Sequence, residues 1–147
     1  MAQASLESTN DLEKGMSTRV TDVPAADSIE AAEHFQSALR FETDCWDVHE
    51  STKHDCADFV LLDVRSPHAY RKGHVEGALS LPHAKISHET LNAFPPDTVF
   101  VVYCAGPHCN GAHRAAIKLA QLRRPVKMMI GGITGWLDEG FQLVSKP

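Results

Sequence analysis

The sequence predicts a single α/β domain built on a mainly parallel sheet. Three apolar runs, residues 59–64 (FVLLDV), 98–104 (TVFVVYC) and 126–130 (VKMMI), are typical of parallel strands whose two faces are both covered by helices. Helical patterns separate these runs, and alternating strands and helices favour a parallel sheet with right-handed crossovers. The length of 147 residues suits one domain and is too short for two ordinary ones.

The N-terminal part of the chain predicts a tail followed by the start of the domain. Residues 1–26 contain much Ser, Thr, Asp, Glu and Ala and few large apolar side chains. Such a segment cannot offset the entropy of ordering itself, so we expect a mobile tail. The domain then extends over 27–147. It begins with a helix capped near Asp27 and Ser28, because apolar side chains follow at helical spacing.

The remaining elements connect the three strong strands. Residues 111–123 predict a helix whose narrow face of Ala and Leu suits close packing on a sheet. Prolines delimit several of the other elements, because proline ends strands and helices. These shorter elements are a strand at 41–45, a helix at 46–53, a turn and short helix at 66–74, a strand at 77–82, a helix at 87–94, and a last helix that follows Gly131 and Gly132 and contains Trp136.

The composition limits the classes of partner. Hydrophobic residues make up 43% and charged residues 22% of the chain, as in ordinary globular proteins. The net charge of -5 attracts neither nucleic acids nor anionic membranes, so we expect neither as a partner. The N-terminal segment lacks an apolar signal-peptide core, and no apolar run is long enough to cross a bilayer. The sequence therefore predicts a cytoplasmic protein whose four cysteines are thiols.

The segment after the second strong strand carries the clearest chemistry. Cys104 ends that strand, and a loop then leads into the predicted helix. A loop that enters a helix turns backbone N–H groups inward and adds the positive end of the helix dipole, so it stabilises an anion. We expect this cradle to lower the pKa of the Cys104 thiol and make it a nucleophile. The cradle is expected to comprise Ala105, Gly106, Pro107, His108, Cys109, Asn110 and Gly111.

Three separated motifs occur together in this sequence. They are the aromatic-x-x-G-H-x-x-G-A segment from Tyr70 to Ala78, the loop cysteine Cys104, and the Gly-Gly-x-x-x-Trp segment at 131–136. In type and order they resemble the signatures of single-domain rhodaneses, a family of sulfurtransferases. The resemblance covers nearly all of the chain outside the tail. It implies a rhodanese-like three-layer fold, in which helices flank the central sheet, and no cofactor.

The resemblance also implies a reaction. Cys104 would take sulfur from a donor such as thiosulfate, become a persulfide, and pass the sulfur to a thiol or to cyanide. Asp63 and Arg65 match the family's Asp-x-Arg pair, which supports the loop. Arg114, one turn into the following helix, is expected to steer an anion to the site. The implied partners are a small sulfur-donor anion or a persulfide, and a thiol acceptor that is a small molecule or a protein.

The loop departs from the family pattern in its charges. Many rhodaneses that favour thiosulfate carry Arg or Lys within the loop, and neither occurs between Ala105 and Asn110. A persulfide donor is therefore an alternative to thiosulfate. The related phosphatases need Arg six residues after the cysteine, where this chain has Asn110. Phosphatase activity is accordingly not expected.

Cys109 leaves two interpretations open. It can resolve a Cys104 persulfide or sulfenic acid by closing a disulfide, or it can turn its sulfur into the junction of sheet and helix and never meet Cys104. Alternative functions are thus a thiol-disulfide redox protein or an arsenate reductase that uses both cysteines, and a non-catalytic rhodanese module that binds a partner. No metal is expected, because the spacing of Cys and His does not match the usual zinc motifs.

Overall fold

The computed structural model describes residues 15–54 and 57–146. The chain divides into two compact units, residues 1–36 and 37–147. Helix α2 (Ser28–Phe41) begins where the sequence predicts, and the Asp27 carboxylate accepts a hydrogen bond from the backbone N–H of Ile29 at 2.7 Å. Much of the expected tail, residues 1–14, lies outside the described residues, as does Cys56. The mobile tail over 1–26 and the free thiol of Cys56 therefore stay predictions.

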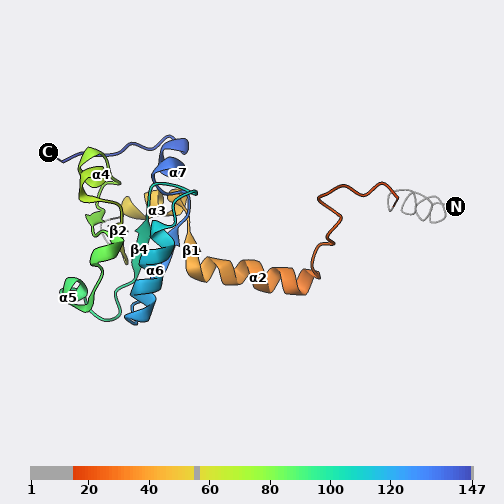
Figure 1. The fold of residues 1–147 in the computed structure, drawn as a ribbon, viewed down its shortest axis with the longest axis horizontal. Coiled ribbons are helices and arrows are strands. Elements are labelled where there is room, and N and C mark those ends of the chain that lie inside the picture. Colours follow the sequence, from red (N-terminus) through yellow and green to blue (C-terminus); the bar gives the residue numbers. More distant parts are fainter. Residues whose placement is uncertain (1–14, 55–56, 147) are drawn as a thin grey trace. The chain divides into compact units, whose positions relative to one another are not determined.

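The second unit contains a five-stranded, all-parallel sheet with the strand order β1-β5-β4-β2-β3 (Figure 1). This arrangement confirms the predicted rhodanese-like α/β fold. Along the chain, its elements are β1 (Glu42–Thr43), α3 (Cys45–Thr52), β2 (Val60–Asp63), α4 (Pro67–Lys72), β3 (Leu79–Ser80), the 3-10 helix η1 (His83–Lys85), α5 (His88–Leu91), β4 (Phe100–Tyr103), α6 (Gly111–Gln121), β5 (Val126–Met129) and α7 (Gly132–Asp138).

The central strand β4 has buried side chains on both faces of the sheet, as its unbroken apolar sequence predicts. On one face, Phe100 and Val102 pack in a cluster with residues of α5 and α6. On the other face, Val101 and Tyr103 pack with residues of α3 and α7. Each large apolar side chain buried in this way contributes about 1.5–3 kcal/mol to stability. The helices thus form two outer layers around the sheet.

Helix α6 connects the core to the loop after β4. Its small residues Ala112 and Ala115 and its Leu119 are buried, whereas the exposed side chains of the helix are mostly polar and include Ile117. The small side chains allow α6 to lie close beside β4 and β5 (Figure 1). As a result, the N-terminus of α6 lies at the carboxyl end of β4.

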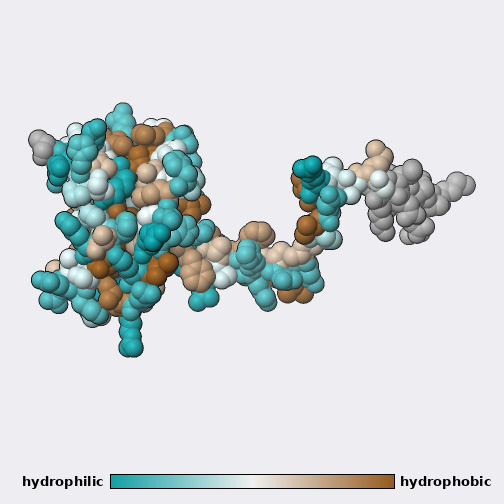
Figure 2. Space-filling model, in the orientation of Figure 1, coloured by the Kyte–Doolittle hydropathy of each residue, from teal (hydrophilic) through white to brown (hydrophobic). Residues whose placement is uncertain are grey.

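Polar residues dominate the visible surface of the unit that contains the sheet. Figure 2 shows hydrophilic residues over most of that face, interrupted by smaller hydrophobic patches. None of the helices in the described residues has both the length and the apolar character needed to cross a membrane.

Candidate active site

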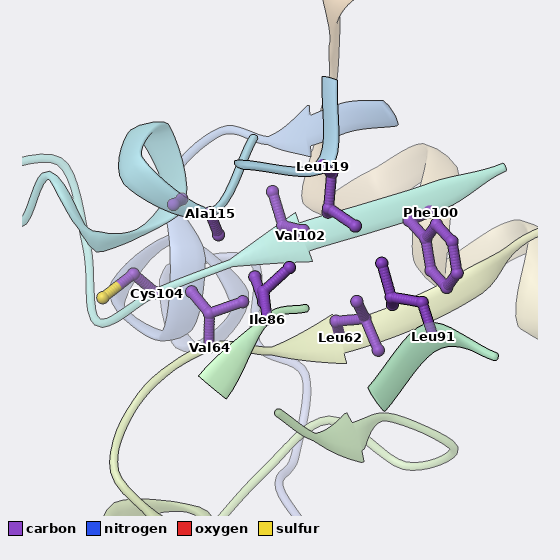
Figure 3. Packing of buried hydrophobic residues seen from close by; sticks show 10 residues of the cluster. Leu62, Val64, Ile86, Leu91, Phe100, Val102, Cys104, Ala115 and Leu119 are labelled. Carbon is purple, nitrogen blue, oxygen red and sulfur yellow. The ribbon is translucent and has the colours of Figure 1, made fainter. Parts of the chain in front are cut away.

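Cys104 is the first residue after β4 and is 6% exposed. Figure 3 shows its side chain at the end of the apolar cluster, with the sulfur directed away from the neighbouring Val64 and Ala115. The β-carbon of Cys104 therefore belongs to the core, whereas its sulfur faces the loop. Sheets of this class bind their ligands at this edge.

Helix α7 holds the start of the loop. The backbone N–H of Ile133 donates to the carbonyl of Cys104 at 3.1 Å, and the N–H of Thr134 donates to the carbonyl of Ala105 at 3.0 Å. Gly132 has φ +57, and a β-carbon there would collide with the Cys104 carbonyl oxygen. Only glycine combines this backbone conformation with so close an approach. The Gly-Gly-x-x-x-Trp motif thus positions the loop, and its Trp136 is buried in the core.

Helix α6 begins directly beside the Cys104 sulfur. A β-carbon on Gly111, the first residue of α6, would lie 2.7 Å from Cys104 Sγ. The absence of that carbon lets the sulfur rest against the helix N-terminus, where the helix dipole stabilises negative charge. Cys104 therefore lies between the N-terminus of α6 and the part of the loop that α7 holds.

Cys109 lies next to Cys104. Their Sγ atoms are 2.7 Å apart, and both cysteines are free thiols. A disulfide bond would need about 2.05 Å, so the two sulfurs are in contact without being joined. Cys109 also packs against the core cluster on the α6 side of the sheet. The interpretation in which Cys109 never meets Cys104 is therefore wrong, although its sulfur does lie at the junction of sheet and helix.

The thiols of Cys104 and Cys109 have pKa values that are shifted in opposite directions. Burial, followed by the hydrogen bond with Cys109, raises the pKa of Cys104 to about 11, although the backbone N–H of Ala105 opposes this change. The hydrogen bond with Cys104, followed by the backbone N–H of Gly111, lowers the pKa of Cys109. The expectation that the cradle lowers the pKa of Cys104 is wrong, because burial and the neighbouring sulfur outweigh the N–H groups. Cys109 is the thiol that ionises first.

A pocket of about 540 Å³ opens beside the two thiols. Within the described part of the chain, no lysine or arginine lines this pocket. Asp44, Asp138 and Glu139 lie along it and are exposed, and His113 is its one histidine among those residues. The site therefore presents more negative than positive charge to a ligand. The apolar part of the lining consists of Pro107, Ala112, Met128, Met129 and Ile130.

Asp63 and Arg65 form a buried ion pair at the end of β2. Asp63 is fully buried, and the Arg65 guanidinium donates to both of its carboxylate oxygens, at 3.0 and 2.7 Å. Arg65 also donates to the carbonyl of Gly73 at 2.6 Å. Both charges are thus committed to neighbouring protein groups, and the arginine is not free to bind a substrate.

Tyr103 links this ion pair to the loop. Its hydroxyl donates to Asp63 Oδ2 at 2.7 Å and accepts from the backbone N–H of Val75 at 3.1 Å. Since Tyr103 directly precedes Cys104, the pair supports the loop through the end of β4. Tyr103 is not among the predicted site residues, although a polar hydroxyl inside an apolar run, next to Cys104, indicates a buried hydrogen bond near the site.

The other predicted loop residues are more peripheral. His108 and Arg114 are exposed, and Arg114 Nε donates to the Asn110 side-chain oxygen at 3.2 Å. Asn110 precedes α6 without capping it through its side chain. Arg114 therefore contacts Asn110 on the loop, and it is not among the described residues that line the pocket.

Cys45 also lies near the loop, although it is not among the predicted site residues. Cys45 begins α3, yet it lines the same pocket, and its thiol contacts the carbonyls of Ile130 and Gly132 at 3.5 and 3.6 Å. Burial and the charge of Asp44 raise its pKa to about 11, which disfavours the reactive thiolate. In the described residues, no three His, Cys, Asp or Glu side chains are grouped in a way that holds a metal ion.

Comparison with known proteins agrees with this architecture. Residues 46–139, which include β2, β4, the loop and α7, match the profile of the rhodanese-like domain. The chain belongs to the rhodanese-like domain family. The BH2092 protein from Bacillus halodurans is 37% identical, with a TM-score of 0.78 over 81% of this chain and 87% of that one.

Two relatives of this rhodanese-like domain are thiosulfate sulfurtransferases. GlpE of Pseudoalteromonas translucida is 32% identical over 82 residues, which cover 56% of this chain and 76% of GlpE. The enzyme from Pseudomonas aeruginosa is 25% identical, with a TM-score of 0.60 over 80% of this chain and 22% of its own.

A third relative is a regulator. The HTH-type transcriptional regulator Rv0324 of Mycobacterium tuberculosis is 30% identical over 94 residues, which cover 60% of this chain and only 41% of the regulator. This chain therefore resembles part of a longer regulator as well as sulfurtransferases.

Proposed function

We propose that this rhodanese-like domain is a sulfurtransferase in which Cys104 carries sulfur as a persulfide. The observation that carries the proposal is the position of the Cys104 sulfur, which lies beside a pocket and the N-terminus of α6, with a second thiol 2.7 Å away. A persulfide anion at that position is stabilised by the helix dipole and by the backbone N–H of Ala105.

Cys109 supplies the base that the buried nucleophile needs. Because Cys109 ionises before Cys104, its thiolate takes the Cys104 proton as the Cys104 sulfur attacks the sulfane sulfur of the donor. A new S–S bond forms on Cys104, and the donor S–S bond breaks. The donor leaves with the electron pair, as a thiolate from a persulfide or as sulfite from thiosulfate. An acceptor thiolate or cyanide then removes the outer sulfur.

The charges around the pocket favour a persulfide donor over thiosulfate. Thiosulfate carries two negative charges, and the three carboxylates along the pocket repel it without a lysine or arginine among the described lining residues to offset them. A persulfide on an uncharged or protein-borne group avoids this repulsion, and the apolar lining suits it. We place the reaction in the cytoplasm, where thiols remain reduced.

Acid-quenched intact-mass spectrometry tests the proposal. After brief incubation with glutathione persulfide, we expect the wild-type chain to gain one sulfur atom, and Cys104→Ser to gain none. In the presence of cyanide, the wild type should form thiocyanate, whereas Cys104→Ser should lose at least about 10³-fold in rate, as expected for a removed nucleophile. Cys56→Ser is the matched control, because it removes a thiol outside the loop.

The outcomes separate the three classes of function. Sulfur gain and thiocyanate formation that survive Cys104→Ser would contradict the proposal. If the chain loses two hydrogens on treatment with arsenate or a disulfide, and gains no sulfur from glutathione persulfide, the result favours the redox protein or arsenate reductase. If the mass does not change under any of these conditions, the domain is a binding module.

A further inference from the structure

We propose that Cys109 resolves the Cys104 persulfide, so that the loop releases the sulfane sulfur as hydrosulfide and closes a Cys104–Cys109 disulfide. This inference rests on the proposed function, because it starts from the Cys104 persulfide. The observation that carries it is the 2.7 Å separation of two free thiols in one loop. The removal of the outer sulfur by an external acceptor does not use Cys109.

The separation decides which sulfur Cys109 can attack. The outer sulfur of a persulfide lies about 2.05 Å from the inner one, and it cannot fit between two sulfurs that are 2.7 Å apart. It must therefore extend from Cys104 away from Cys109, toward the pocket. Cys109 then faces the inner sulfur, which is the atom whose attack expels hydrosulfide.

The loop backbone keeps Cys109 in this position. The backbone N–H of Cys109 donates to the carbonyl of Gly106 at 3.1 Å, which closes a tight turn. A β-carbon on Gly111 would lie 2.7 Å from the Cys104 sulfur and 3.5 Å from the Cys109 sulfur, so both sulfurs pack over this glycine. Disulfide formation needs the sulfurs to move together by less than about 1 Å.

The step balances within the loop. The Cys109 thiol, which took up a proton during loading, passes that proton to the outer sulfur of the persulfide. The resulting Cys109 thiolate attacks Cys104 Sγ, a bond forms between the two Sγ atoms, and the bond from Cys104 Sγ to the outer sulfur breaks. The outer sulfur takes the electron pair and leaves as hydrosulfide. The two cysteine sulfurs are oxidised by two electrons together, and the sulfane sulfur is reduced by two. The lowered pKa of Cys109 favours the loss of this proton.

Another turnover requires a reductant. Two equivalents of a low-molecular-weight thiol, or one dithiol protein, reduce the loop disulfide by thiol-disulfide exchange. The net reaction then consumes a persulfide and two thiol equivalents, and produces a thiol, hydrosulfide and a disulfide. The domain would accordingly act as a persulfide reductase as well as a sulfur carrier.

The experiment loads the reduced full-length chain with glutathione persulfide and then removes the donor by rapid gel filtration. Hydrosulfide is trapped with monobromobimane, and the intact mass is followed over time. We expect the wild type to release about one hydrosulfide per loaded chain and to lose two hydrogens relative to the reduced chain. Because Cys109→Ser lacks the base for loading, it is incubated with the donor until its intact mass shows one added sulfur. It should then keep this sulfur on Cys104 and release at least about ten-fold less hydrosulfide per loaded chain. Cys56→Ser should behave as the wild type does.

The result that overturns the inference is clear from the same data. If the wild type keeps its added sulfur as long as Cys109→Ser does, or if peptide mapping finds the sulfur on Cys109, resolution to a disulfide does not occur. If Cys109→Ser and the wild type both fail to gain sulfur at the earliest time, the proposed function itself fails. Thermal melts of both variants show whether each has folded.

Discussion

Strands β2 and β4 lie side by side in the sheet, yet charged side chains follow the first and thiols follow the second. At the end of β2, Asp63 is buried, Arg65 is half-buried, and the two charged side chains hydrogen-bond to each other and to the protein backbone. At the end of β4, the thiols of Cys104 and Cys109 contact each other. At these two strand ends, the charged pair supports the fold, whereas the proposed reactive site relies on weakly acidic thiols and backbone N–H groups.

Tyr103 joins the two ends. Its hydroxyl binds Asp63, and the next residue is Cys104. Desolvation and the negative charge of Asp63 raise the pKa of the Tyr103 hydroxyl well above its ordinary value, so it remains a proton donor at any physiological pH. The charged end therefore fixes the geometry of the reactive end without contributing a reacting group.

The largest effect is expected from removing the charge at the end of β2. Asp63→Asn leaves the Arg65 guanidinium, whose side chain is only 13% exposed, without its carboxylate. Loss of one partner from a buried ion pair costs about 3–5 kcal/mol. Urea denaturation should show this loss, whereas the exposed control Asp97→Asn should change stability by less than about 0.5 kcal/mol. An equal loss of stability in both variants would mean that the ion pair at the end of β2 does not stabilise the fold.

An intermediate effect is expected in the pH dependence of the thiols. Only the thiolate reacts with iodoacetamide, so a raised pKa moves alkylation to higher pH and a lowered pKa moves it to lower pH. We expect Cys109 to be alkylated at lower pH than Cys104, whose reaction should rise up to a pH of about 11. Peptide mapping after brief alkylation at each pH measures both profiles.

The variant Cys109→Ser sharpens this result. It removes the neighbouring thiol that raises the pKa of Cys104, so alkylation of Cys104 should shift to lower pH. Burial of Cys104 persists in the variant and keeps the shift incomplete. An unchanged Cys104 profile would show that the two thiols are not coupled.

The smallest effect is expected from the carboxylates along the pocket. The pair of changes Asp138→Asn and Glu139→Gln removes two negative charges near the thiols. The rate with thiosulfate, relative to that with an uncharged persulfide, should rise by about three- to ten-fold at low salt. The rise should shrink as salt is added, because exposed charges are screened. A ratio that does not change would remove the electrostatic argument for a persulfide donor.

Elements that are controlled by a local pattern are predictable from the sequence. The apolar runs at 59–64 and 98–104 contain β2 and β4, although the hydrogen-bonded strands are shorter than the runs. Ser87 caps α5 through the backbone N–H of Thr90, at the start of the helix predicted over 87–94. Caps, prolines and apolar runs act over a few residues, so they are visible without any tertiary contact.

By itself, the sequence determined the family, the parallel α/β architecture, and the place of Cys104 between a buried strand and a helix. Only the tertiary structure decided how the thiols behave. It placed Cys109 against Cys104, brought Cys45 from α3 to the same pocket, and buried Cys104 deeply enough to raise its pKa. The physical reason is that burial and sulfur-sulfur contact depend on how segments distant in sequence pack together, and a local motif does not contain that information.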